Sequence, residues 1–115
     1  MHEKILLKWE AQVKKGVLDF ILLLLLKEKE SYGYELIEGI HIRIGYEIAE
    51  GTIYPLLNRL KDDRLVEAYW QEKASHETGI PRKYYRITPE GKQMLQDMKV
   101  YWTELSINLQ KLLIH

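Results

Sequence analysis

Hydrophobic residues recur at helical spacing in four stretches of the chain, separated by polar breaks. The first stretch is expected to form a helix from about Lys4 to Lys27, and its second half contains the almost wholly apolar run 17–26. Such a run predicts a helix that is buried on most sides. Ser31 is expected to cap a second helix over 32–44, and Gly45 is a typical helix stop.

A third helix is predicted over residues 50–62, followed by two strands over 65–71 and 82–87. The helix carries apolar side chains at i, i+3, i+4 and i+7, and strand-favouring residues dominate the two segments after it. Successive side chains of a strand point to opposite faces, so we expect one of Tyr84 and Tyr85 in the core. The apolar positions predicted to be buried on the helix are Ile53, Leu56, Leu57 and Leu60.

The last helix is predicted to begin at Pro89, with Thr88 as its N-cap, and to run to about Leu113. Its apolar positions follow alternating steps of three and four residues, which is the spacing of a coiled-coil seam. A long seam at the end of a small domain needs a partner, and a second copy of the chain is the simplest one. The predicted dimerisation residues are Leu95, Met98, Trp102, Leu105, Leu109 and Leu112.

The composition limits the chemistry that the chain can perform. A chain of 115 residues is one domain, and its lack of cysteine excludes a thiol nucleophile and fits a reducing cytoplasm. The four histidines are scattered and no glycine-rich phosphate loop occurs, so we predict no metal, no other cofactor and no enzymatic activity. The run 17–26 is too short to cross a membrane, which takes about 20 apolar residues.

The polar side of helix 50–62 and the basic hairpin after it favour DNA binding. A formal net charge of zero argues against a general nucleic-acid coat, but a sequence-specific binder needs only a locally positive contact face. A polar helix that can enter a groove, beside a basic β-ribbon, is typical of a winged helix-turn-helix. The predicted DNA contacts are Thr52, Tyr54, Asn58 and Lys61 on the helix, with Arg82 and Lys83 on the hairpin.

Residues 32–35, 50–60 and 81–88 together resemble the PadR family of bacterial transcriptional regulators. The short single C-terminal helix is similar to that of the smaller PadR subfamily. The resemblance implies a mainly α-helical fold with a small β-hairpin, in which a winged helix-turn-helix over 1–88 precedes a C-terminal dimerisation helix over 89–115. It also implies a cytoplasmic homodimer that represses transcription from a near-palindromic operator in double-stranded DNA.

The same resemblance implies a ligand site at the dimer centre. In drug-sensing members, a tryptophan that matches Trp102 stacks on planar aromatic effectors. An apolar slot with methionine walls suits such ligands, and the lone acid Asp19 is expected to attract cationic ones. The effector-binding candidates are Trp102, Met98, Met94, Val13, Gly16, Asp19 and Phe20.

Two alternatives stay open at this stage. A winged-helix module that binds protein instead of DNA agrees with the zero net charge and with acidic residues around the third helix, such as Glu50 and Asp62. Trp102 can also simply pack within the helix seam. The hairpin loop carries His76 and Glu77 where the family often has glycine, so DNA contacts from the loop tip are left open, as is repression against activation.

Overall fold

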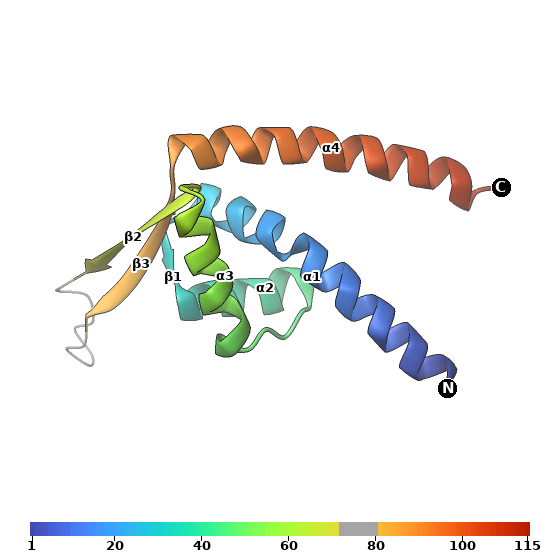
Figure 1. Cartoon of the computed structure of the whole chain (residues 1–115), viewed down its shortest axis with the longest axis horizontal. Coiled ribbons are helices and arrows are strands. Elements are labelled where there is room, and N and C mark those ends of the chain that lie inside the picture. Colours follow the sequence, from blue (N-terminus) through green and yellow to red (C-terminus); the bar gives the residue numbers. More distant parts are fainter. Residues whose placement is uncertain (72–80) are drawn as a thin grey trace.

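The computed structural model describes residues 1–71 and 81–115, so His76 and Glu77 lie outside the described residues. The fold is mainly helical with a small antiparallel sheet, as predicted (Figure 1). The elements in chain order are α1 (His2–Glu28), β1 (Ser31–Tyr32), α2 (Gly33–Ile44), α3 (Glu50–Asp62), β2 (Val66–Gln71), β3 (Arg82–Ile87) and α4 (Pro89–Leu113).

The sheet has the strand order β1-β3-β2, and the predicted hairpin supplies two of its strands. The third strand, β1, was not predicted: Ser31 pairs with Tyr85, and its hydroxyl donates to the Lys29 carbonyl instead of capping α2. The N-cap of α2 is Tyr32, whose backbone N–H donates to the Glu35 carboxylate at 3.2 Å. The capping prediction was therefore wrong by one residue, because pairing with β3 extends the backbone at Ser31.

Local signals set two other helix ends as predicted, at Gly45 and at Thr88. Gly45 ends α2 in the left-handed region, with φ of 88°, where a residue without a side chain is favoured. The Thr88 hydroxyl accepts the Gly91 N–H at 2.9 Å at the start of α4. A Cβ on Gly91 would lie 2.1 Å from the Leu65 carbonyl oxygen, so glycine allows α4 to begin directly against the loop before β2.

The core lies where α1, α2 and α3 pack on one face of the sheet. Ile53, Leu57 and Leu60 are buried as expected, whereas Leu56 is only half-buried. Tyr85 is the buried tyrosine of the β3 pair. Leu95 differs from the prediction: it is 1% exposed and packs in the core of its own chain, so it is not available on the seam for a second copy.

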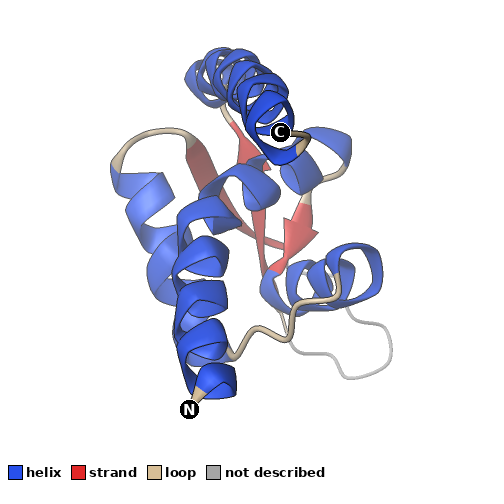
Figure 2. Cartoon of the chain, turned by 90° about the vertical axis from the view of Figure 1, so that its right-hand side faces the viewer, coloured by secondary structure: helices blue, strands red, loops and turns tan. Residues whose placement is uncertain are grey.

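The N-terminal half of α1 and the C-terminal half of α4, here called the far halves, extend beyond this core. They diverge toward the end where both termini lie, opposite the hairpin (Figure 1). Seen from that end, the small sheet lies behind the helices (Figure 2). These far halves expose large apolar side chains such as Trp9, Trp102 and Leu109. Within residues 1–71 and 81–115, no helix is long and apolar enough to cross a membrane.

Candidate nucleic-acid interface and a second apolar groove

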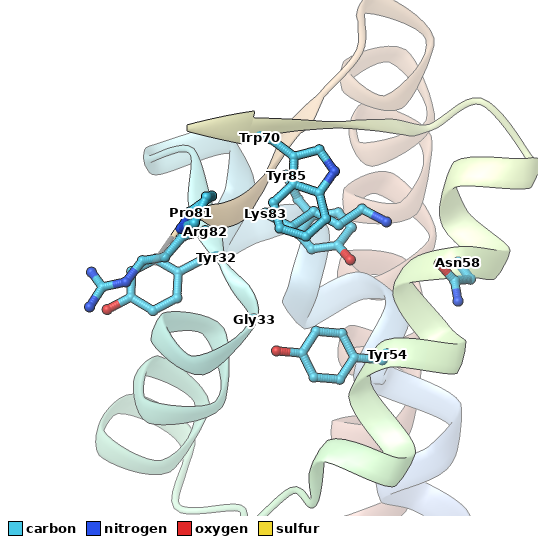
Figure 3. A pocket seen from close by; sticks show the side chains of 9 residues that line it. All are labelled: Tyr32, Gly33, Tyr54, Asn58, Trp70, Pro81, Arg82, Lys83 and Tyr85. Atoms are coloured by element: carbon cyan, nitrogen blue, oxygen red, sulfur yellow. The ribbon is translucent and has the colours of Figure 1, made fainter. Parts of the chain in front are cut away.

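A cleft of about 470 Å³ lies between α3 and the hairpin (Figure 3). It brings together residues from α2, α3 and all three strands, because the sheet and α3 pack on the same core. None of its described lining residues is acidic, and two are basic. The residues that line it are Tyr32, Gly33, Tyr54, Asn58, Trp70, Pro81, Arg82, Lys83 and Tyr85.

Tyr54 spans the floor of this cleft from α3 to the start of α2. Its hydroxyl points toward Gly33, where an added Cβ would lie 2.4 Å from the phenol oxygen (Figure 3). Burial raises the pKa of Tyr54, and the nearby Glu50 carboxylate raises it further, so the hydroxyl stays protonated and can donate a hydrogen bond. Tyr54 therefore holds α2 against α3 as well as facing the cleft.

The two adjacent cations of the hairpin lie on opposite faces of β3, because successive side chains of a strand alternate. The Arg82 guanidinium carbon lies 4.5 Å from the centre of the Tyr32 ring. The Lys83 Nζ lies 6.0 Å from the Trp70 ring and 5.9 Å from the Tyr85 ring, on the side that faces α3. Both cations still border the cleft, one from each face of the strand.

The other predicted contacts on α3 are all on its exposed side. Asn58 borders the cleft, whereas Thr52 and Lys61 are exposed outside it. The guanidinium of Arg59 is paired with the Asp19 carboxylate of α1, with both N–O distances at 2.8 Å. The exposed side of α3 thus offers an amide, a hydroxyl and an ammonium group to a ligand that covers the cleft.

A second, apolar groove of about 740 Å³ lies between α1 and α4, and it extends from Phe20 and Met94 near the core out to Trp9 and Leu109. The Phe20 and Trp102 rings contact each other on its floor, with centroids 5.9 Å apart. Five of the effector-binding candidates besides Trp102 line this groove. These are Met98, Met94, Val13, Gly16 and Phe20.

Asp19 differs from its expected place. It does not line the groove, because its carboxylate turns to the other side of α1 and pairs with Arg59. The acid that lines the groove is Asp97 of α4. Of the predicted seam residues, Met98, Trp102, Leu105 and Leu109 line the groove, while Leu112 lies beyond it and is 73% exposed.

Sequence reasoning missed several residues of both sites. Tyr32 and Trp70 entered the cleft through strand pairing, and a two-residue strand such as β1 leaves no periodic signal. Trp9 and Val17 of the groove did carry a signal, because they belong to the apolar stripe of the first helix. Tyr101 and Asp97 fall on α4 beside the seam positions, where a helical wheel places them next to Met94 and Met98.

The model of the PadR-like family of transcriptional regulators matches residues 21–97. A protein of Lysinibacillus sphaericus described as uncharacterized is 37% identical over 97 residues, which cover 83% of this chain and 86% of the relative. The family model spans the cleft, most of the core and the first part of α4.

Solved structures give the same result for the fold. A PadR family transcriptional regulator of Eggerthella lenta has a TM-score of 0.83 at 30% identity, covering 97% of this chain and 95% of its own. A PadR-like transcriptional regulator of Bacillus cereus has a TM-score of 0.79 at 35% identity, covering 89% and 96%. The winged-helix arrangement predicted from the sequence is thereby confirmed.

Proposed function

Because the chain belongs to the PadR-like family of transcriptional regulators, we propose that it acts in the cytoplasm as a homodimeric repressor on a near-palindromic operator. Members of this family regulate transcription by binding DNA and are not enzymes. Repression, the dimer and the contact residues are what we propose beyond membership of the family. Each copy would place α3 in a major groove, with half-sites one helical turn, roughly 34 Å, apart.

The observation that carries the DNA proposal is the composition of the cleft. Asn58 reaches it from α3, and Arg82 and Lys83 reach it from β3, with no acidic side chain among its described lining residues. An amide can make two hydrogen bonds to adenine, while cations contact phosphates without reading sequence. The cleft therefore combines a base-reading group with backbone anchors.

The test is a titration of a labelled duplex carrying the promoter of the protein's own gene, at several salt concentrations. We expect Arg82→Ala and Lys83→Ala each to weaken binding to every sequence and to reduce the salt slope by about 0.9 per lost phosphate contact. Asn58→Ala should lose about 1–3 kcal/mol of preference at one base pair with the slope unchanged.

Lys92→Ala is the matched control, since it removes the same charge from an exposed position of α4 outside the cleft. A salt slope that stays the same in both hairpin variants would contradict the role given to β3. If the wild-type chain shifts no duplex even at low salt, a winged-helix module that binds protein becomes the better account.

The dimer proposal is supported by the exposed apolar surface of α1 and α4. The groove between them is almost wholly apolar, and the seam of α4 continues past it to Leu112. A surface of this kind marks an interaction site in a protein of this size. A second copy, whose own α4 would lie along the groove, satisfies both copies at once because a two-fold interface is self-complementary.

We further propose that this groove binds a planar aromatic effector, as in the drug-sensing small subfamily. Trp102 and Phe20 offer ring faces for stacking, and Met94 and Met98 provide adaptable walls. Asp97, in place of Asp19, supplies a carboxylate that favours cationic ligands. Binding of such a molecule between two copies would change their spacing and release the operator.

Quenching of tryptophan fluorescence by a planar cationic dye tests this second proposal. We expect Trp102→Ala to weaken dye binding about twofold to tenfold, because one stacking face is lost. Trp70→Phe is the control, since Trp70 lies in the cleft and not in the groove. Unchanged dye affinity in Trp102→Ala would leave Trp102 as a residue that only packs.

A further inference from the structure

Three tyrosines form a row across the outer face of the sheet, one from each strand. Tyr84 of β3 is opposite Tyr32 of β1 and opposite Tyr69 of β2. The Tyr32 and Tyr84 rings meet edge to face with centroids 5.4 Å apart, and the Tyr84 and Tyr69 rings stack at 5.7 Å. Cross-strand aromatic pairs of this kind stabilise a small sheet.

An arginine lies at each end of this row. The Arg86 guanidinium lies 4.9 Å from the Tyr69 ring centre and pairs with the Glu67 carboxylate at 2.8 Å. The Arg82 guanidinium carbon lies 4.5 Å from the Tyr32 ring centre, and Arg82 is one of the residues that line the cleft (Figure 3). The row thus connects the base of the hairpin, where its arginine is bound to a carboxylate, with the mouth of the cleft.

Stacking on a ring orients a guanidinium without using its N–H donors. An arginine that is ordered in advance loses less side-chain freedom when it binds a phosphate. The backbone of Tyr32 is fixed in turn, because its N–H donates to Glu35 and its strand pairs with β3. The backbone that carries the ring under Arg82 is therefore fixed by both the start of α2 and the sheet.

We propose that Tyr32 is a positioning residue for DNA binding, which holds the Arg82 guanidinium ready for a phosphate while Tyr84 and Tyr69 support its ring. This inference rests on the proposed function of the cleft. It assigns the outer face of the sheet a part in recognition, although that face is turned away from α3. Lys83 has no part in it, because it lies on the other face of β3.

The test is a double-mutant cycle between Tyr32→Leu and Arg82→Ala, measured by fluorescence anisotropy on the promoter duplex with the full chain. We expect Tyr32→Leu to weaken binding about twofold to fivefold, the range for an exposed cation–π contact. The same substitution should cause no further loss in the Arg82→Ala background. Tyr32→Phe, which keeps the ring, should bind as the wild type does.

Arg82→Lys gives a second route that does not disturb the sheet. This substitution keeps the charge but loses the planar stacking group, so the variant should bind DNA about as weakly as Tyr32→Leu does. Adding Tyr32→Leu to Arg82→Lys should then cause no further loss of affinity. Equal losses from Tyr32→Leu in both backgrounds would overturn the inference, because they indicate a purely structural role. A loss in Tyr32→Phe would overturn it as well, because the phenol hydroxyl would then be the contact.

These outcomes are separate from a failure of the proposed function. If the wild-type chain binds the duplex and the cycle is additive, only the role of Tyr32 is lost. If the wild-type chain does not bind DNA at low salt, the DNA-binding role of the cleft is lost and this inference with it.

Discussion

The cleft and the groove differ in how much of each is built by one chain. The residues that line and charge the cleft come from α2, α3 and the sheet, which pack on one core. The groove has two walls that diverge, and both carry apolar side chains into solvent. One copy is therefore enough to form the proposed DNA-contacting surface, whereas the proposed effector site would need a second copy to close it.

The two regions also differ in chemistry, and this difference agrees with a cleft formed by one copy and a groove that needs two. Polar and cationic groups in the cleft are well hydrated, so the cleft can stay open to water until a charged ligand binds. Apolar surface in the groove is unfavourable in water until it is covered. We expect each region to be altered by substitutions that leave the other intact.

The largest effect should come from a charge placed in the groove. Leu105→Glu puts a carboxylate on a wall that a second copy would cover, so we expect a monomer by light scattering. Affinity for a full operator should then fall about a hundredfold to ten-thousandfold, because the two half-sites are no longer bound by one linked pair. Binding to a duplex with a single half-site should not change.

Thr103→Glu is the matched control for this variant. It adds the same charge to an exposed position on the other side of α4, outside the groove. Should Leu105→Glu remain a dimer with unchanged operator affinity, the groove is not the dimer interface.

An intermediate effect is expected from a methyl group added to the floor of the cleft. Gly33→Ala places a Cβ 2.4 Å from the Tyr54 hydroxyl and 2.6 Å from its ring, so the phenol must move into the cleft. Overpacking costs about 1–3 kcal/mol in the free energy of unfolding, which urea denaturation measures. DNA affinity should fall while the dimer persists, because the groove does not contain Tyr54.

Gly16→Ala is the opposite case in the groove. Within one chain an added Cβ meets nothing within 4 Å, and alanine favours the helix interior, so the free energy of unfolding of the single chain should rise by about 0.5–1 kcal/mol. In a Tyr54→Ala background, Gly33→Ala should cost no stability, because the clashing ring is absent. A cost that persists there would show that Tyr54 is not the cause.

Features set by neighbouring residues could be predicted from the sequence, whereas features set by residues far apart in the chain could not. Helix ends at Gly45 and Thr88 are set by neighbouring residues, and the prediction was confirmed at both. Strand β1 exists only because Ser31 and Tyr32 pair with residues more than fifty positions away, so no local pattern marks it. For this reason the predicted set of cleft residues did not include Tyr32.

The helix seam shows a second limit. A heptad position says that a side chain is buried against a neighbour, but not whether the neighbour belongs to the same chain. Leu95 packs in its own core and Leu105 lines the open groove, although both fit the same repeat. The place where α4 leaves the core decides between them, and only tertiary structure gives that place.

The smallest effect is expected from the ion pair that lies between the two regions. Asp19 belongs to α1, whose opposite side lines the groove, and its partner Arg59 follows Asn58 on α3. Both side chains are partly exposed, at 32% and 60%, so Asp19→Asn should cost no more than about 0.2–1 kcal/mol, and less at high salt.

The same substitution should act on DNA binding in the other direction. Release of Arg59 from its carboxylate adds a mobile cation beside Asn58, so non-specific affinity should rise and the salt slope should steepen by up to about 1. Asp97→Asn is the control, because it removes one acid from the groove and leaves Arg59 paired. If both variants change the slope equally, overall charge is the cause, and the position of Arg59 on α3 has no role in DNA binding.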